Sequence, residues 1–216
     1  NNAIIHFSSQ WFYDGLVESA PEVTGRSILD FDDPIIWIDT SNPGVRMKFR
    51  TLLDGSSSLD DQVEDNSDFS EQCVGENHGR INKAEALMTL HVLKEYINKI
   101  GQQRFLAERF DVGVVSPYKV QMQYLRSLVK KTTFFRPFSS LITINTVDGF
   151  QGQERDIMLV SLVRSNDNGQ IGFLSDLRRM NVAITRARMK LIIIGDVATL
   201  SHHPFYRKLY EYVGSL

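Results

Sequence analysis

Five short apolar runs, separated by segments with helical spacing, constrain the fold of this chain more than any other feature. The runs are continuous rather than alternating, as in strands buried on both faces, and they cover residues 34–39, 111–117, 141–147, 157–163 and 191–195. Apolar residues recur at helical spacing from Ala84 to Ile97, and residues 119–131 and 177–188 are also predicted to be helical. This alternation predicts an α/β fold with a mostly parallel sheet and helices on both faces.

The two ends of the chain and one internal segment complete this outline. Residues 1–17 end in aromatic residues followed by Asp14-Gly15, which predicts a short helix closing in a turn. A helical segment is also predicted after the last apolar run. Residues 44–79 are polar, acidic and rich in Ser and Gly, so we expect a single domain over residues 1–216 with a mobile insertion at 44–79. An ordinary solvated loop is favoured there over a regulatory element.

The net charge of −2 is unevenly distributed along the chain. Residues 54–76 hold eight acidic residues and no Lys or Arg. Setting those eight aside leaves 24 basic against 18 acidic residues, a mild basic excess. Such an excess is compatible with a polyanionic partner such as a nucleic acid, and equally with an ordinary neutral domain.

The composition argues against several classes of protein. Cys73 is the only cysteine, which excludes an internal disulfide and a cysteine-based zinc site. No apolar run approaches 18 residues, and no signal segment is recognisable, so we expect an intracellular protein, cytoplasmic or in the nucleoid or nucleus, with no membrane partner. His202-His203, with no third ligand nearby, predicts a surface turn rather than a metal site.

Residues 146–156 form the first of two segments with recognisable chemistry. Gly149 and Gly152 permit turns or a close approach of the backbone to a ligand. Thr146 and Asp148 can contact a phosphate or cap a turn. Gln151 can orient water, and Glu154 can accept hydrogen bonds from two ribose hydroxyls. The alternative is a polar loop that only connects two strands.

Residues 178–188 form the second segment, which contains four arginines. On a helix, Arg179 and Arg186 share one face, and Asn181 and Arg188 share another. A guanidinium is always charged and matches phosphate oxygens in a bidentate fashion. The alternative is a solvated basic helix face. We expect both segments to lie at the carboxyl edge of the sheet, where ligands of such sheets bind.

Together the two segments resemble motifs V and VI of superfamily 1 helicases of the senataxin and nonsense-mediated-decay type. Residues 146–157 follow the motif V pattern, and residues 172–188 follow that of motif VI, the most specific part of the resemblance. Residues 115–121 resemble motif IV, and Phe7-Ser-Ser with residues 12–15 resembles the segment that opens the second motor domain. The resemblance covers the chain except the acidic insertion and implies a RecA-like three-layer sandwich.

The resemblance also implies roles for individual residues. Arg186 is similar to the arginine that reaches the γ-phosphate of the nucleotide, and Glu154 to the carboxylate that holds the ribose. Gln151 and Asp148 are similar to residues that couple the nucleotide to the strand. The implied site residues are Arg186 and Gln151 for catalysis, Glu154, Arg186 and Gly152 for the nucleotide, and Ser116, Tyr118, Thr146 and Asp148 for the nucleic acid.

The chain has no Gly-x-x-x-x-Gly-Lys-Ser/Thr phosphate loop, and no Asp-Glu pair follows an apolar strand. Asp196 is interpreted as a helix cap that follows a core strand. The resemblance thus implies the second RecA-like domain of an ATP-dependent helicase acting on single-stranded DNA or RNA. ATP and Mg²⁺ would be shared with the first RecA-like domain of the same polypeptide, and the isolated chain would be inactive. The alternative is a non-catalytic nucleic-acid-binding or protein-docking module with the same fold.

Overall fold

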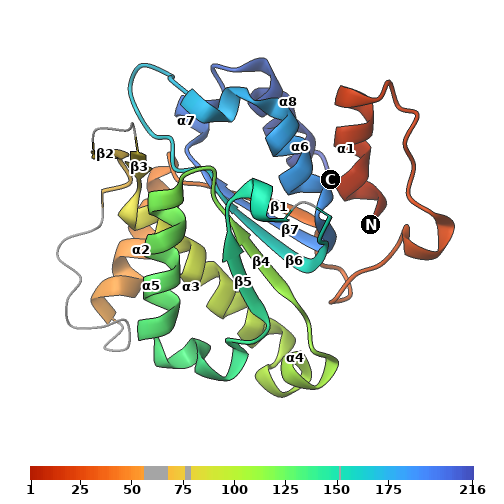
Figure 1. Ribbon diagram of the computed structural model, residues 1–216, viewed down its shortest axis with the longest axis horizontal. Coiled ribbons are helices and arrows are strands. Elements are labelled where there is room, and N and C mark those ends of the chain that lie inside the picture. Colours follow the sequence, from red (N-terminus) through yellow and green to blue (C-terminus); the bar gives the residue numbers. More distant parts are fainter. Residues whose placement is uncertain (56–67, 76–78, 151) are drawn as a thin grey trace.

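A five-stranded parallel sheet forms the centre of the protein, seen in a computed structural model that describes residues 1–55, 68–75, 79–150 and 152–216 (Figure 1). The strand order is β1-β7-β6-β4-β5, and every pairing within this sheet is parallel. The strands are β1 (Ile35–Asp39), β4 (Val112–Val115), β5 (Ile142–Asn145), β6 (Arg155–Ser161) and β7 (Ala187–Gly195). The predicted parallel sheet is confirmed, and the five apolar runs supply its strands.

Helices cover both faces of the sheet, which completes a RecA-like α/β sandwich of three layers (Figure 1). One face packs against α3 (Lys83–Ile100) and α5 (Lys119–Lys131), with α2 (Pro43–Gly55) and α4 (Gln102–Glu108) beside them. The other face packs against α1 (Asn2–Phe12), α6 (Leu177–Thr185) and α8 (Pro204–Val213), with the short α7 (Val197–Leu200).

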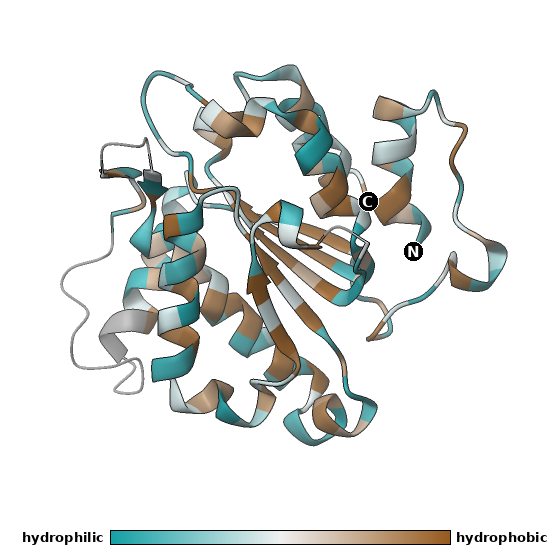
Figure 2. Cartoon of the chain, viewed as in Figure 1, coloured by the Kyte–Doolittle hydropathy of each residue, from teal (hydrophilic) through white to brown (hydrophobic). Residues whose placement is uncertain are grey.

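Alternation along β6 explains why its sequence is apolar at nearly every position. Ile157 and Leu159 join the core under α3 and α5, whereas Met158 and Val160 join the core under α1 and α6. A strand buried on both faces needs apolar side chains on each. Figure 2 shows the strands as the most hydrophobic part of the chain, with polar residues on the outer faces of the helices.

The predicted helix over residues 177–188 is too long. Helix α6 ends at Thr185, and β7 begins at Ala187, which pairs with Arg155 of β6. The backbone N–H of Arg155 donates to the Arg186 carbonyl at 2.8 Å, so long-range strand pairing overrides local helical spacing. The face that Asn181 and Arg188 were predicted to share does not exist, because Arg188 lies on a strand.

The prediction of a solvated loop over residues 44–79 is wrong for residues 44–55, 72–74 and 79, which lie in a helix and two strands. Helix α2 occupies the first part, and its Phe49 is 2% exposed in the core. Phe69 is equally buried and contacts Phe49 edge-on. A two-stranded antiparallel ribbon, β2 (Gln72–Val74) and β3 (Gly79–Ile81), follows. Mobility was also predicted for this acidic stretch. Its residues 56–67 and 76–78 lie outside the described residues.

Two predictions about the C-terminal part are confirmed. The Asp196 carboxylate accepts from the Thr199 N–H at 2.9 Å and caps α7 as it follows β7. Residues 201–203 form the predicted turn, in which His202 is exposed, and the His203 ring then caps α8 by accepting from the Phe205 N–H at 3.2 Å. Within the described ranges, no helix is long and apolar enough to cross a membrane, and no three His, Cys, Asp or Glu side chains gather as a metal site would require.

Candidate functional site at the two edges of the sheet

The residues of the predicted site are divided between opposite edges of the sheet. Ser116 and Thr146 follow the carboxyl ends of β4 and β5. Glu154 and Arg186 instead precede the amino ends of β6 and β7. The prediction that both segments lie at the carboxyl edge is therefore wrong for Arg186. A helix that leads into a parallel strand delivers its own last residues to the amino end of that strand.

The described residues of the first motif, 146–150 and 152–154, lie between the two edges, and η3 packs on the α6 side of the sheet. A short 3-10 helix, η3 (Val147–Phe150), buries Val147 and Phe150 in the core shared with α6. At Gly149 a Cβ would lie 2.2 Å from the Asn145 side chain, so a larger residue there would require that side chain to move. Gly152 has a φ of +75° and turns the chain toward β6. Gln151 lies outside the described residues.

Arg186 is held at the end of α6 by weak contacts only. Its Nε lies 3.4 Å from the Val182 carbonyl, and its Nη2 lies 3.5 Å from the Thr185 hydroxyl. The residue is half-buried, and among the described residues no carboxylate forms an ion pair with it. The guanidinium is thus positioned by its helix while its charge is not neutralised.

The arginines on either side of Arg186 are neutralised by carboxylates. Arg179 lies 3.4 Å from Asp148 of η3, a pair that joins the two motifs at the surface. Arg188 lies 3.2 Å from Asp111 and 3.6 Å from Asp156. Burial, reinforced by the neighbouring Asp111, raises the pKa of Asp156, and Arg188 opposes that shift. Arg178 is exposed on the first turn of α6.

Glu154 lies beside Arg186 at the amino edge. Its carbonyl accepts from Arg155 Nη1 at 2.9 Å and from Arg188 Nη2 at 3.4 Å, which fixes the backbone. Its side chain is exposed and therefore able to accept hydrogen bonds from a ligand. A cation and a hydrogen-bond acceptor thus stand together on one edge, as a phosphate and a sugar would require.

The predicted nucleic-acid residues at the carboxyl edge differ in exposure. Ser116 is fully buried, and its hydroxyl accepts from the Tyr118 N–H at 3.4 Å at the start of α5. Tyr118 is 3% exposed, and its hydroxyl accepts from Arg164 Nη1 at 3.3 Å. Thr146 is half-buried, and Asp148 has a side chain that is 67% exposed. Ser116 and Tyr118 are thus occupied with internal bonds.

Several known proteins have sequences similar to this chain. The chain matches the AAA domain family over residues 1–198. It is 31% identical over 210 residues to the probable helicase MAGATAMA 3 of Arabidopsis thaliana, covering 95% of this chain and 22% of that protein. It is 31% identical over 204 residues to the regulator of nonsense transcripts 1 homolog of Neurospora crassa, covering 94% and 16%. It is 41% identical over 130 residues to the helicase sen1 of Schizosaccharomyces pombe, covering 60% and 8%.

The chain belongs to the superfamily 1 helicases of the senataxin and nonsense-mediated-decay type. It spans less than a quarter of the length of each of these three relatives. The resemblance expected from the two motifs is therefore confirmed at the level of the family.

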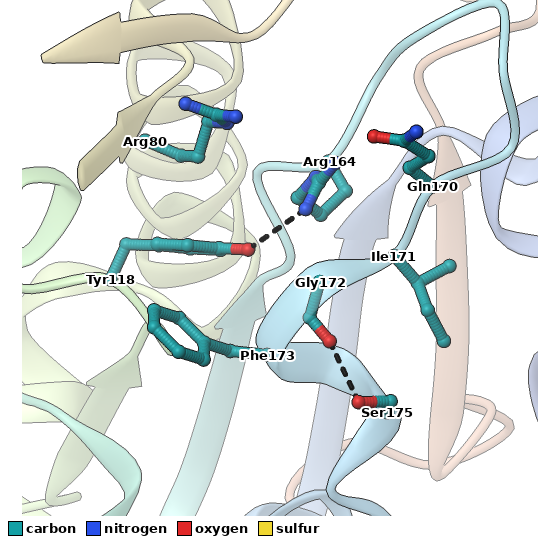
Figure 3. A pocket seen from close by; sticks show the side chains of 8 residues that line it. All are labelled: Arg80, Tyr118, Arg164, Gln170, Ile171, Gly172, Phe173 and Ser175. Carbon is teal, nitrogen blue, oxygen red and sulfur yellow. Dashed lines mark hydrogen bonds between the residues drawn. The ribbon is translucent and has the colours of Figure 1, made fainter. Parts of the chain in front are cut away.

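A pocket of about 510 Å³ lies at the carboxyl edge of the sheet (Figure 3). It was not predicted from the sequence. Phe173 stands at the pocket with 54% of its surface exposed, although it is large and apolar. Below the surface, Glu71 pairs with Arg164 at 2.6 Å and with Arg80 at 3.2 Å. The residues lining the pocket are Arg80, Tyr118, Arg164, Gln170, Ile171, Gly172, Phe173 and Ser175.

A strained turn directs Arg164 into this pocket. Val163 has a φ of +72°, which is rare for a β-branched residue, and the Arg164 N–H donates to the Leu162 carbonyl at 2.8 Å. Buried groups hold the turn: the Glu85 carboxyl accepts from the Val163 N–H and from the Ser161 hydroxyl, both at 2.7 Å. Burial raises the pKa of Glu85 to about 8, so this carboxyl is mainly protonated at neutral pH.

Proposed function

We propose that this chain is the second, C-terminal RecA-like motor domain of an ATP-dependent helicase or translocase. In this proposal, ATP and Mg²⁺ bind between the chain and a first RecA-like domain of the same polypeptide. The observation that carries the proposal is the Arg186 guanidinium at the end of α6, which makes only two weak contacts and lacks a carboxylate partner among the described residues. The neighbouring arginines of the same motif, Arg179 and Arg188, each form an ion pair with a carboxylate.

Arg186 acts in this proposal as an arginine finger. Charge redistributes over the transferring phosphoryl group in the transition state, and a fixed guanidinium stabilises it more there than in the ground state. Glu154 accepts hydrogen bonds from the ribose hydroxyls, and Gly152 allows the backbone to approach the nucleotide. Gln151, proposed to orient the attacking water, lies outside the described residues. The phosphate loop and the metal carboxylate belong to the first domain.

In this proposal, the single nucleic-acid strand lies along the carboxyl edge of the sheet, opposite the nucleotide. Thr146 and Asp148 are the proposed contacts with the nucleic acid. They also couple the nucleic-acid site to the nucleotide site, because the chain that follows them leads to Glu154. Ser116 and Tyr118 take part at the same edge, and their burial indicates that they support the surface from beneath. The charge of Asp148 is shared with Arg179 of motif VI, which provides a direct link between the two motifs.

Steady-state kinetics of the full-length protein test the proposal. Arg186→Ala is expected to lower kcat by about 10³- to 10⁵-fold, the range known for arginine fingers, with little change in nucleotide affinity. Arg186→Lys is expected to restore little, because an ammonium does not reproduce the planar fork. Arg188→Ala is the matched control, since its charge is already neutralised by Asp111 and Asp156. The assignment fails if Arg186→Ala leaves kcat within about threefold while Arg188→Ala abolishes turnover.

A further inference from the structure

The pocket beside Phe173 lies where the topology of the sheet changes direction. Strands β4 and β6 are neighbours, but α5, which follows β4, covers one face, whereas α6, which follows β6, covers the other. The chain segments that leave two such strands diverge and leave a crevice, where ligands of open parallel sheets bind. Tyr118 enters the crevice after β4, and Arg164 enters it after β6.

Phe173 presents a flat apolar surface at this crevice. Its ring packs against Tyr118, with centroids 5.5 Å apart and planes inclined by 43°, so one side is supported by protein. In Figure 3 the Phe173 ring lies next to the Tyr118 ring, and Arg80 lies on the far side of Tyr118. More than half of the Phe173 surface remains open to solvent. An exposed ring supported by a second ring is a platform for a planar apolar ligand.

The platform is rigid before any ligand arrives. Gly172 has a φ of +54°, and a Cβ there would lie 2.1 Å from Arg164 Nη1 and 2.9 Å from the Tyr118 hydroxyl. The backbone therefore packs directly on these two side chains. The Ser175 hydroxyl donates to the Gly172 carbonyl at 2.8 Å and closes the 3-10 helix η4 (Gly172–Ser175), which carries Phe173. Preorganisation of this kind lowers the entropic cost of binding.

The charges around the pocket favour an anionic ligand. Arg80 and Arg164 both contact the single carboxylate of Glu71, which leaves an excess of one positive charge. The Arg164 side chain is 6% exposed and structural, but that of Arg80 is 24% exposed. Gln170 and Ser175 add groups able to form hydrogen bonds at the rim. An aromatic platform, a guanidinium and a rim amide together match a base with its adjoining phosphate.

We propose that this pocket holds one unpaired base of the single nucleic-acid strand, stacked on Phe173, with the adjoining phosphate attracted by the net positive charge of Arg80 and Arg164. This proposal rests on the proposed function in one respect, namely that a single nucleic-acid strand lies along the carboxyl edge of the sheet. It assigns the base contact to Phe173, a residue outside the set predicted from the sequence, and gives Tyr118 the role of supporting that ring. The volume of about 510 Å³ lies in the usual range for pockets that bind small molecules.

Equilibrium binding tests whether Phe173 contacts a base rather than the backbone. The full-length protein without nucleotide is titrated with a short oligothymidine and with a strand of the same length that lacks all bases. Phe173→Ala is expected to weaken oligothymidine binding about tenfold, or about 1.4 kcal/mol, and to leave the abasic strand unaffected, because only the strand with bases loses a stacking contact. Phe173→Trp is expected to retain the wild-type affinity. Phe31→Ala, which removes a fully exposed phenyl group outside the pocket, is the matched control.

Photochemistry gives a second, independent measurement. An oligonucleotide with 5-iodouracil at successive positions is irradiated in the complex, and the crosslinked residue is identified by mass spectrometry. We expect a crosslink to Phe173. An equal loss of affinity for both strands in Phe173→Ala, an unchanged affinity for oligothymidine, or a crosslink elsewhere overturns the proposal. These measurements use no nucleotide, so failure of the ATPase assignment to Arg186 would remain a separate result.

Discussion

Replacing Glu85 by Gln should remove a large part of the pH dependence of stability. Glu85 is fully buried beneath the Val163 turn, and one of its oxygens accepts from Ser161 and Val163. Burial is the main cause that raises its pKa from 4.5 to about 8, and those two hydrogen bonds oppose the shift. The glutamine carbonyl can accept the same two bonds, and a neutral amide has nearly the shape of the protonated carboxyl.

The direction and size of the effect follow from linkage between protonation and folding. Below pH 4.5 the carboxyl is protonated in both states, so its contribution to stability is intact. Between pH 4.5 and about 8 the unfolded chain releases the proton while the folded chain keeps it, so stability falls as the pH rises. The loss is about 1.4 kcal/mol per pH unit, on the order of 5 kcal/mol at most over the window.

Urea unfolding at a series of pH values measures this effect. We expect the free energy of unfolding of Glu85→Gln to change little across the window, to lie within about 1 kcal/mol of the wild type at pH 5, and to exceed it by several kcal/mol at pH 9. Glu22→Gln changes an exposed carboxyl and should keep the wild-type slope. Parallel pH profiles for Glu85→Gln and the wild type would refute a buried, protonated Glu85.

Further outcomes are expected from other features of the structure. Arg188→Ala should lower the free energy of unfolding by about 1 kcal/mol at neutral pH in a urea titration, because its two carboxylate partners are only partly buried, and by less at pH 4 as Asp156 is protonated. Gly172→Ala should cost at least about 1 kcal/mol, seen as a melting temperature lower by about 2–4 °C, since a left-handed φ and a contact with Arg164 are both unfavourable; an unchanged melting temperature contradicts this. The isolated chain should show no ATP hydrolysis above a blank and should bind single strands weakly, with affinity falling steeply as salt rises in a fluorescence-anisotropy titration. Hydrolysis that disappears in Arg186→Ala would contradict the shared nucleotide site.

Local pattern was sufficient for the sheet and for several helices. Continuous apolar runs identified all five strands of the sheet, and α5 has the predicted bounds of residues 119–131. The lengths of β7 and α6 were not predictable, because the change from helix to strand at residue 186 depends on pairing with β6, more than thirty residues earlier. Helix α2 was missed because its apolar residues are interspersed with polar ones and, among its described side chains, only Phe49 is fully buried.

The site was only partly predictable for a related reason. Motif residues are close in the sequence, so Arg186 and Glu154 could be recognised, although their edge of the sheet could not. The pocket combines Arg80, Tyr118, Arg164 and Phe173, which come from separate segments. The pocket also requires the strained turn at Val163. That turn is held by a hydrogen bond from the Val163 N–H to the buried Glu85 of α3. Neither feature leaves a pattern in the local sequence.

Arg186 and the residues proposed to contact the nucleic acid lie at opposite ends of the β-strands, so a rotation at one edge of the sheet displaces the other edge. The central strand β6 has seven residues, so the two edges are about 23 Å apart. In the motor that we propose, the domain rotates about the amino edge, because that edge contacts the nucleotide. A rotation of about 8–9° around that edge moves the carboxyl edge by about 3.4 Å, which equals the rise per nucleotide of one DNA strand. In the proposed motor, a small closure at the nucleotide is therefore enough for a step of one base.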